Sequence, residues 1–416
     1  MRVLLITVGT RGDIAPFAAL AQRLVAEGHT AVLAAPEPYR SDAPSGVEFA
    51  PMGTEADRVM RAAMTRLRSP AQAFTLAGEM NRALRAALQE QWRIAEDSSP
   101  THVVAHPKAL GGPHIAERLS VPFSASVPAP LLTPTAAFPA PVLARRLPGA
   151  LNRLTYQLNR SAGMAYGGMV NRFRMETLGL PRMSRFSDYL TDRAGRRLPV
   201  LYPFSPAVIP RPADYPPSAH ITGFWFRADA PGWERPAELA AFLDQGGPVV
   251  YVGLGSMGFG GSAEERGRLL VDALQETGVR AVVSAGWGGV RPGASDGIHL
   301  MGDVPHEQLF PLVDAVVHHG GAGTTAAGLR AGRPTLICPM LGDQPLWGRR
   351  VHDVGAGPEP LPLRRARTRD LAERIRRLVG EAGFAERAGE LAARIAQEDG
   401  TGEAVRILES GARTGE

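Results

Sequence analysis

The chain has 416 residues, of which 44% are hydrophobic and 21% are charged, a balance that is ordinary for a globular protein and excludes a disordered or fibrous chain. The formal net charge is only +5, and no block of like charge is interleaved with aromatic residues, which argues against a nucleic acid partner. Cys338 is the only cysteine, so an internal disulfide and a thiolate metal cluster are excluded. One hydrophobic core rarely serves a chain of this length, which predicts two domains.

No apolar run reaches the roughly 18 residues that a membrane-spanning helix needs. The apolar opening, residues 3–8, ends at once in a Gly-Thr-Arg-Gly-Asp turn without a cleavage site, so we interpret it as a strand rather than a signal peptide. A cytoplasmic protein is therefore expected. Almost all basic residues are arginine, and Lys108 is the only lysine.

The first half of the chain alternates between strand and helix patterns. Residues 2–8 predict a strand, residues 14–27 an amphipathic helix closed by Gly28, and residues 30–35 the next strand. Such an opening is typical of a doubly wound parallel sheet. Further strands are expected at residues 102–106, 122–126 and 200–205, and helices at residues 55–97, 114–119 and 151–190.

Proline recurs throughout residues 122–148 and interrupts regular structure there. A long irregular segment of this kind is either a roof over a substrate or an exposed loop, and the sequence leaves both open. A second proline-rich run, residues 203–217, predicts a stiff connection between two domains.

The second half restarts the same pattern. Strands are expected at residues 248–252, 280–284 and 315–318, a helix at residues 306–313, and a helical tail at residues 372–410. We therefore expect a first domain at residues 1–204, a linker at residues 205–235 and a second domain at residues 236–395. Residues 396–416 are expected to form a C-terminal helix that packs back on the first domain.

The most informative stretch is residues 316–344, which reads as a strand, a glycine-rich turn, a short helix, a second strand and a second turn. Both turns would open at the carboxyl edge of a parallel sheet, where such sheets bind ligands. Glycines leave backbone N–H groups unshielded where the helix begins, so the first turn suits an anion such as a diphosphate. The first turn contains Gly320, Gly321 and Gly323, and the second contains Asp343 and Gln344.

Gly253, Gly255 and Gly258 follow a strand with the spacing of a dinucleotide-binding turn. That site also needs an acidic residue about 20 positions later to hold the ribose hydroxyls, and residues 284–287 contain none. A nicotinamide-dependent oxidoreductase is therefore disfavoured. Ser256 in this turn is either a turn hydroxyl or a phosphate ligand.

Several polar positions keep two interpretations each. Asp13 is either a helix N-cap or a carboxylate that removes a proton from an acceptor hydroxyl as the oxygen attacks, and Asp343 is either a cap or a ligand. His318 and His319 point to opposite faces of their strand, so at least one projects toward the glycine turn. There it would either donate to a phosphate or be a satisfied core histidine. Adjacent histidines lack a zinc-ligand spacing, so no metal is expected.

With these motifs the sequence resembles nucleotide-sugar-dependent glycosyltransferases of the GT-B fold, in particular the sterol glucosyltransferases and actinobacterial antibiotic glycosyltransferases. The matching stretches are residues 9–13, 109–117, 202–206, 223–226, 251–257 and 318–344. The resemblance implies an α/β protein with two Rossmann-like doubly wound parallel-sheet domains that face each other across a cleft. The first domain would bind the acceptor and the second the nucleotide sugar.

The resemblance also implies roles for individual positions. Asp13 matches the general base, and Asp343 and Gln344 match the pair that binds the donor sugar hydroxyls. Asp303 and Val304 lie where the family binds the nucleoside. The positions that match the diphosphate-binding set are Gly255, Ser256, His319, Gly321, Ala322, Gly323 and Thr324.

The sequence departs from the plant small-molecule glycosyltransferases at three places. Those enzymes carry Trp where Asp303 aligns and a ribose-binding Glu where Ala327 aligns. Their base is a His held by a later Asp, whereas here Asp13 comes first and His106 stands at the later strand end. We therefore hypothesise that His106 approaches Asp13 and tunes it.

The resemblance implies an inverting transfer of a hexose, with glucose favoured, from a UDP- or dTDP-sugar to a hydrophobic hydroxylated acceptor such as a sterol, triterpenoid, polyketide or other aglycone. Neither a cofactor nor a metal is expected. Two rivals stay open: a nucleotide-sugar epimerase of the same fold, and a non-catalytic partner protein. The arginine-rich helices between residues 58 and 93 are either solvated or in peripheral contact with an anionic membrane, and the protein is a monomer or a homodimer.

Overall fold

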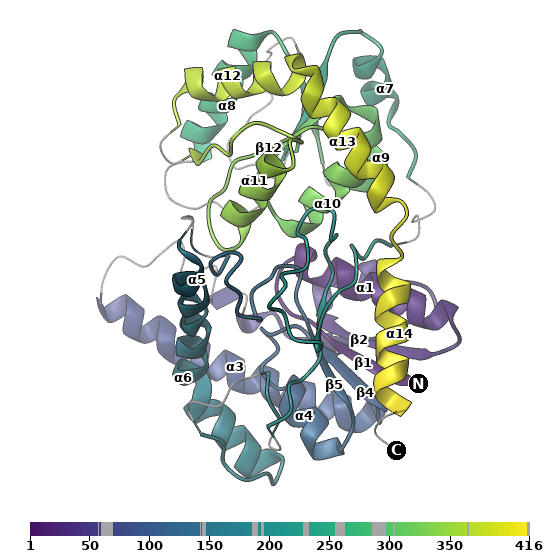
Figure 1. Ribbon diagram of the computed structural model, residues 1–416, viewed down its shortest axis with the longest axis vertical. Helices are drawn as coiled ribbons and strands as arrows, with labels where there is room; N and C mark the ends of the chain where they lie inside the picture. Colours follow the sequence, from purple (N-terminus) through teal and green to yellow (C-terminus); the bar gives the residue numbers. More distant parts are fainter. Residues whose placement is uncertain are drawn as a thin grey trace.

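The computed structural model describes residues 1–413 except 57, 60–69, 142, 144–146, 185–189, 193–194, 228–232, 254–262, 285–296, 303 and 364–365. Its named strands form two parallel sheets, one in each half of the molecule (Figure 1). The first sheet consists of β1 (Arg2–Ile6), β2 (Thr30–Pro36), β3 (Glu48–Met52), β4 (His102–Ala105), β5 (Phe123–Ser126), β6 (Val200–Tyr202) and β7 (Ala219–Ile221). The second consists of β8 (Val249–Gly253), β9 (Arg280–Ser284), β10 (Ile298–Met301), β11 (Ala315–His318) and β12 (Thr335–Ile337).

The five strands of the second sheet follow the same order as the first five strands of the first sheet. The first runs β3-β2-β1-β4-β5-β6-β7 and the second runs β10-β9-β8-β11-β12. In each, the connections turn in opposite directions from the first and fourth strands of the domain, which leaves a crevice at the carboxyl ends of that pair. The fold therefore predicts a ligand crevice beyond β1 and β4 and another beyond β8 and β11.

Helices cover both sheets. Those of the first half are α1 (Arg11–Ala26), η1 (Glu37–Asp42), α3 (Pro70–Ser98), α4 (Gly112–Leu119), α5 (Gly149–Thr155), α6 (Gln157–Arg172) and η2 (Phe173–Thr177). Those of the second half are α7 (Ala237–Leu243), α8 (Ala263–Thr277), α9 (His306–Leu309), η3 (Phe310–Leu312), α10 (Ala322–Arg330), α11 (Gln344–Asp353), α12 (Thr368–Gly380) and α13 (Ala382–Ile395), and α14 (Gly400–Arg413) follows.

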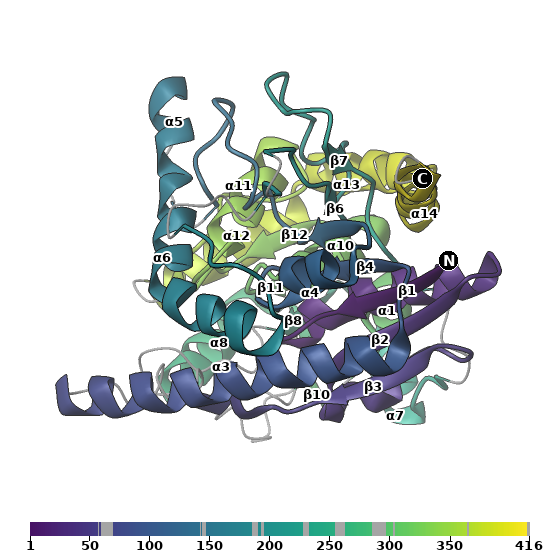
Figure 2. The ribbon, with the colours of Figure 1, turned by 90° about the horizontal axis from the view of Figure 1, so that it is seen from below.

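The central strand β1 is buried on both faces. Leu4 and Ile6 pack with residues of α3 and α4, whereas Val3 and Leu5 pack with residues of α1 and α14. This division follows from the alternation of side chains along a strand. Figure 2 shows α3 running along one face of β1, β2 and β3. A nearly continuous apolar sequence is what a parallel strand covered on both faces requires.

The segment between β5 and α5 is irregular, as its prolines predicted, but it is not an exposed loop. Val127, Ala129 and Phe138 are buried in it, and the amide of Thr133 donates to the Tyr202 hydroxyl at 2.9 Å. The Arg350 guanidinium of α11 stacks over the Phe138 ring at 5.2 Å. The segment therefore packs between the two halves of the molecule.

The proline-rich residues 203–217 do not connect the domains directly. They lead into β7, which pairs with β6 and extends the first sheet beyond residue 204, the boundary expected from the sequence. The chain then passes residues 222–227 on its way to α7. Near Gly400 the returning chain meets this crossing segment: a Cβ on Gly400 would lie 2.4 Å from the carbonyl oxygen of Phe224.

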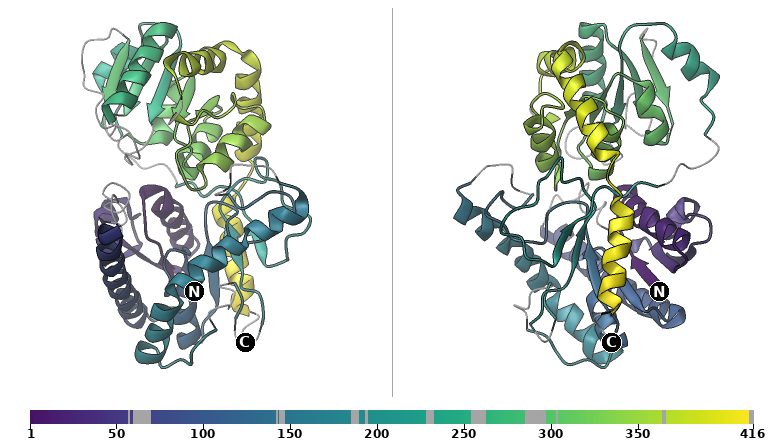
Figure 3. Two further views of the ribbon diagram at one scale, coloured as in Figure 1. Left: turned by 90° about the vertical axis from the view of Figure 1, so that its left-hand side faces the viewer. Right: turned by 45° about the vertical axis from the view of Figure 1, so that its right-hand side comes forward.

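The helical tail expected at residues 372–410 is three helices. The last of them, α14, leaves the second domain and lies along the first, as both views of Figure 3 show. Ala404, Val405 and Leu408 of α14 join the apolar cluster formed by α1 and β1. Burial of this apolar face against α1 is what fixes α14 on the first domain.

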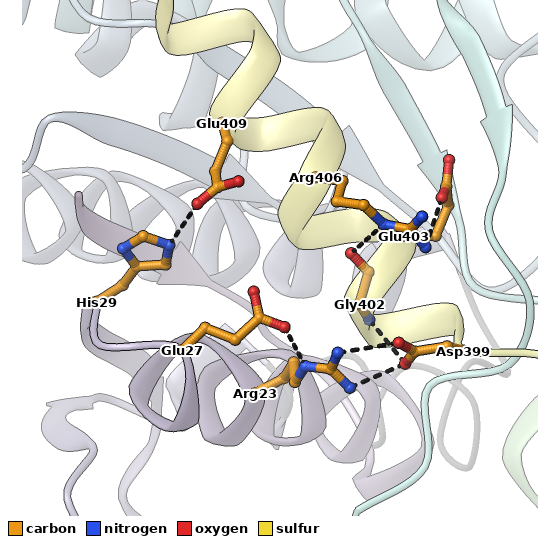
Figure 4. Close-up of polar contacts among 8 residues, drawn as sticks. All are labelled: Arg23, Glu27, His29, Asp399, Gly402, Glu403, Arg406 and Glu409. Atoms are coloured by element: carbon orange, nitrogen blue, oxygen red, sulfur yellow. Dashed lines mark hydrogen bonds and ion pairs between the residues drawn. The ribbon is translucent and has the colours of Figure 1, made fainter.

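Polar contacts at the C-terminal end of α1 hold the returning chain (Figure 4). Arg23 forms two hydrogen bonds with Asp399, each 2.9 Å long, and His29 Nε2 lies 3.1 Å from a carboxylate oxygen of Glu409. Exposed pairs of this kind contribute little individually, on the order of 0.5 kcal/mol. Their effect is to fix the direction in which the chain crosses back.

An aromatic contact joins the two domains near the crossing. The Trp347 side chain of α11 is fully buried, and its ring lies 6.3 Å from Phe204 and 6.4 Å from Phe224. One apolar cluster therefore extends from the first sheet to α11 without a break. This contact sets the spacing of the two ligand crevices.

Candidate active site

Asp13 lies at the crevice of the first sheet. Thr10 precedes α1 and Asp13 occupies the third helical position, so the N-cap role considered for Asp13 belongs to Thr10 instead. The Asp13 carboxylate accepts hydrogen bonds from the Thr10 amide at 2.8 Å and the Thr10 hydroxyl at 3.1 Å. Asp13 thus closes a capping box, and its side chain stays 13% exposed.

His106 follows β4, the strand adjacent to β1, and meets Asp13 in the crevice. Its Nε2 lies 3.4 Å from Asp13 Oδ1, so the proximity that we hypothesised is present. The Lys108 amide donates to His106 Nδ1 at 3.1 Å, which leaves the proton of the neutral ring on Nε2, facing Asp13. Burial lowers the pKa of His106 to about 4, so the ring is neutral at pH 7.

The sequence reasoning missed Lys108, which stands in the same loop. Its Nζ donates to both carboxylate oxygens of Asp13, at 2.8 Å each, and its side chain remains 55% exposed. Gly9, with φ of +121°, makes room for the pair, because a Cβ there would lie 2.4 Å from Asp13 Oδ2 and 3.1 Å from Lys108 Nζ. The position of the lysine immediately after a central strand was the available signal.

Opposing effects act on the pKa of Asp13. Burial disfavours the charged carboxylate, but the positive charges of Lys108 and protonated His106, with hydrogen bonds from Lys108 and Thr10, outweigh it and hold the pKa below its ordinary value. Because His106 is neutral at pH 7, Lys108 supplies the positive charge there. The carboxylate is therefore ionised at neutral pH.

The second crevice contains the glycine turn between β11 and α10. His318 is fully buried, and its Nδ1 accepts the Gly320 amide at 3.0 Å. His318 is therefore the core histidine of the pair. Gly320 has φ of +93°, and a Cβ on it would lie 2.6 Å from Ile337 Cγ2, so only glycine fits this turn.

His319 is half-buried and lies at the start of α10, where a Cβ on Gly321 would be 2.7 Å from its Nε2. Burial lowers the pKa of His319, although a hydrogen bond to the backbone of Gly253 opposes this shift. The Nδ1 of His319 is buried and has no hydrogen-bond partner among the described residues. The polar ring nitrogens of His319 therefore lie next to the N-terminus of α10.

The first helical residues of α10 are Ala322, Gly323 and Thr324, and Gly321 is the N-cap. Their amides precede the first intrahelical bond, from Thr325 N to Gly321 O at 2.9 Å, so they are free to face an anion. A Cβ on Gly323 would lie 4.0 Å from the Cα of Gly12 in α1. The start of α10 therefore faces the start of α1 across the two domains.

Asp343 and Gln344 complete the second crevice. Asp343 holds the N-cap position of α11 without capping it, and its Oδ2 accepts the Trp347 indole N–H at 2.9 Å. Gln344 Oε1 accepts the amides of Met340 and Leu341 at 2.8 and 3.1 Å, which orients its side chain. Burial raises the pKa of Asp343, and the Asp13 charge adds to this effect, which places the two carboxylates in one electrostatic environment.

Replacing Trp347 with phenylalanine is expected to lower the free energy of unfolding by about 2 kcal/mol at pH 7, because one hydrogen bond to a charged group is lost. The loss should shrink in acid, since protonated Asp343 is a weaker acceptor and its raised pKa brings protonation within reach. Urea unfolding at pH 7 and pH 4.5 measures both values. An equal loss at the two pH values would contradict this account.

Three predicted site residues fall outside the described residues: Gly255, Ser256 and Asp303. Val304 is described and half-buried, and it packs against the cluster that contains Tyr251 and Phe310. Ala327, which aligns with the ribose-binding glutamate of the plant small-molecule glycosyltransferases, is buried in the same cluster. The second crevice is therefore built by α10, α11 and the β11–α10 turn in the part of the chain that can be described.

An apolar pocket adjoins the Asp13–Lys108 pair in the first domain. Its walls include Val8, Met52, Leu84, Leu88 and Leu110, and Lys108 stands on its edge. A larger cavity of about 330 Å³ lies where the chain crosses between the domains, and it contains none of the predicted site residues. The apolar pocket is small, about 40 Å³, and it places apolar side chains next to Lys108, the partner of Asp13.

Among the residues with described positions, no group of three or more His, Cys, Asp and Glu side chains has the geometry to hold a metal ion. Within those same ranges, the helices lack the combination of length and hydropathy that a bilayer crossing requires.

Comparison with known families places matches on both halves of the chain. Residues 3–138 match the glycosyltransferase family 28 N-terminal domain, and residues 288–410 match the erythromycin biosynthesis protein CIII-like C-terminal domain. Two sterol 3-beta-glucosyltransferases of Arabidopsis thaliana are similar over most of the chain. One is 36% identical over 376 residues, covering 87% of this chain and 58% of the relative; the other is 34% identical over 419 residues, covering 97% and 67%. The chain thus spans about three fifths to two thirds of their length.

Solved structures are similar over the full chain. The glycotransferase of kitacinnamycin superposes with a TM-score of 0.71 at 17% identity and covers 99% of this chain and 98% of its own. Glycosyltransferase VinC in complex with dTDP superposes with a TM-score of 0.66 at 20% identity, covering 100% of both chains. At these identities the likeness concerns the fold, and it confirms the two-domain GT-B architecture.

Proposed function

Because this chain belongs to the glycosyltransferase family that includes the sterol 3-beta-glucosyltransferases, we propose that it transfers a sugar from a nucleoside diphosphate sugar to a hydroxyl group of a hydrophobic small molecule. One observation carries this proposal: an ionised carboxylate at the start of α1 faces the N-terminus of α10 across the domains, with Gly12 and Gly323 in near contact. A base and an anion site are thereby held on opposite sides of one gap.

The donor would bind in the second crevice. The amides of Ala322, Gly323 and Thr324 and the ring of His319 would hold the diphosphate, with Gly321 allowing its close approach. Asp343 would accept hydrogen bonds from the sugar hydroxyls, and Gln344 would donate through its NH₂ group, since its Oε1 already holds the β12–α11 turn. Gly255, Ser256, Asp303 and Val304 complete the proposed donor site by resemblance.

The acceptor would bind in the first domain with its hydroxyl at Asp13, and apolar side chains near Lys108, such as Val8 and Leu88, would contact its body. The apolar walls and the sterol substrates named for the two plant relatives support an acceptor of sterol, triterpenoid or polyketide type. The same relatives support glucose as the sugar, and the dTDP complex of VinC supports dTDP as the carrier, with UDP proposed by the family resemblance alone.

In the proposed step, the acceptor oxygen attacks the anomeric carbon as Asp13 takes its proton. The new carbon–oxygen bond forms while the bond to the diphosphate breaks, and the electron pair leaves with the diphosphate. His319 and the α10 amides stabilise that charge, each contributing on the order of 3 kcal/mol. Attack from the face opposite the leaving group inverts the anomeric centre. His106, whose Nε2 lies 3.4 Å from Asp13 Oδ1, would orient the carboxylate.

The test is a screen of UDP- and dTDP-sugars by thermal shift, followed by mass detection of glycosylated sterols and other apolar alcohols. The expected result is a product one hexose heavier than the acceptor, with inverted configuration by NMR. Conversion of the donor to an epimer without any acceptor would favour the epimerase rival. Donor binding without any turnover, over a broad acceptor panel, would favour the non-catalytic rival.

A further inference from the structure

Lys108 is the only lysine of the chain, and it pairs with the carboxylate proposed as the base. The pair is not an ordinary solvent-exposed ion pair. Asp13 is largely enclosed, with 13% of its side chain exposed, and Gly9 is kept free of a side chain that would collide with both partners. Lys108 also lines the small apolar pocket that contains Val8 and Leu88.

We propose that Lys108 is a positioning residue that keeps Asp13 ionised and aimed at the acceptor hydroxyl. This inference rests on the proposed function. Two equal contacts of 2.8 Å to the two carboxylate oxygens fix the plane of the carboxylate from the pocket side, while Thr10 holds it from the helix side. Thr10 contacts only Oδ2, so Oδ1 is the oxygen with fewer hydrogen bonds and the one proposed to take the acceptor proton.

The charged surroundings of Asp13 explain why a cation is needed. Among the described residues, the titratable groups that act on it are His106 from the end of β4, Lys108 from the following loop, and Asp343 from the second domain. At neutral pH His106 carries no charge, and Asp343 is acidic. Lys108 is therefore the positive charge that offsets burial and the second carboxylate.

Lysine also suits a base that must change charge during the step. When Asp13 takes the acceptor proton, its pairing with the ammonium weakens, and the ammonium can turn to water because more than half of its side chain is exposed. A buried cation would at that moment be left without a counter-ion and without water, which is unfavourable. An exposed lysine can keep the carboxylate ionised before the step, and the ion pair can break when the carboxylate is protonated.

Removing the Lys108 cation should reveal that burial favours the neutral form of the Asp13 carboxyl group. In Lys108→Met, burial is no longer offset, so the pKa of Asp13 rises and the acidic limb of kcat/KM moves to higher pH. We expect the variant to lose about tenfold in kcat/KM between pH 8 and pH 5, whereas the wild type and Lys108→Arg change by less than about twofold. The exposed and distant Arg196→Met serves as a control for loss of any cation, and its profile should match the wild type.

A second measurement does not depend on activity. In the full-length chain labelled with [¹³C]lysine, Lys108 gives a single side-chain NMR signal. At pH 7 that signal should move in Asp13→Asn and stay in place in Asp42→Asn, a matched change in the carboxylate that pairs with Arg11. An unmoved signal would overturn the pairing, and superimposable pH profiles of Lys108→Met and the wild type would overturn the positioning role.

The two readouts separate this inference from the proposed function. If the wild type transferred sugar but Lys108→Met kept its pH profile, only the role of Lys108 would fall. If no donor and acceptor gave a product, the proposed function would fall, and the NMR signal would still support or overturn the pairing.

Discussion

Replacing Asp13 with asparagine is expected to lower kcat/KM about 10³-fold, the loss typical of a removed general base. Asparagine has nearly the same shape, and its oxygen can still accept the Thr10 amide that Asp13 accepts at 2.8 Å. It cannot take the acceptor proton. The comparison is a direct rate measurement of the two proteins at saturating donor.

Folding and donor binding should survive in this variant. Lys108 loses its partner, but an exposed ammonium is readily solvated, so we expect a stability change of less than about 1 kcal/mol. The diphosphate contacts proposed for His319 and α10 are unaffected. Removal of the Asp13 charge also removes one of the effects that raise the pKa of Asp343. A variant that kept wild-type turnover would remove Asp13 from the mechanism, and Asp42→Asn is the control for loss of a carboxylate near α1.

The sequence predicted the central strands of both sheets but missed three of their four edge strands. Strands at β1, β2, β8, β9 and β11 were expected because they are apolar and end at glycine or polar turns. The strands β3, β7 and β10 were not expected, and each lies at the edge of its sheet. Edge strands tolerate proline and polar residues. Pro51 lies within β3, and β7 lies in a stretch whose prolines suggested only a linker.

The parts of the site that lie within one local sequence motif could be predicted. The glycine turn after β11 and the carboxylate after β1 are local patterns, and the family resemblance gave them roles. The Asp13–Lys108 pair joins residues 95 positions apart, and it exists because β1 and β4 are neighbours that end at the same level, with Ile6 beside Ala105. Strand order is a property of the whole sheet, so the position of Lys108 after a strand marked it as a candidate but could not pair it with Asp13.

Local patterns also misjudged what capping residues do. Asp13 and Asp343 were both candidates for N-caps, yet Thr10 caps α1, and Asp343 holds its cap position while bonding Trp347 instead. In both cases a residue one turn away decides the outcome. Asp13 therefore takes part in the capping box of α1 from its third position, whereas Asp343 gives its side chain to Trp347.

Introducing a carboxylate at the start of α10 should separate stability from donor binding. In Gly323→Asp the new charge lies at the second helical position, where the helix dipole favours it by about 0.3–1 kcal/mol. Gly323 is exposed, and the nearest neighbour of an added Cβ is Gly12 at 4.0 Å, so the side chain can be accommodated. The melting temperature should therefore stay the same or rise.

Diphosphate binding should respond in the opposite direction. Two like charges about 4 Å apart repel by about 4 kcal/mol at the effective dielectric of a protein surface, so we expect affinity for UDP or dTDP to fall at least about 10²-fold. Gly323→Ala is the matched control, because it adds the Cβ and the helix propensity without the charge. Calorimetric titration and thermal melting of the three proteins measure both effects. If Gly323→Asp bound the nucleotide as tightly as Gly323→Ala, the diphosphate would have to lie away from the N-terminus of α10, and the proposed donor site would be wrong.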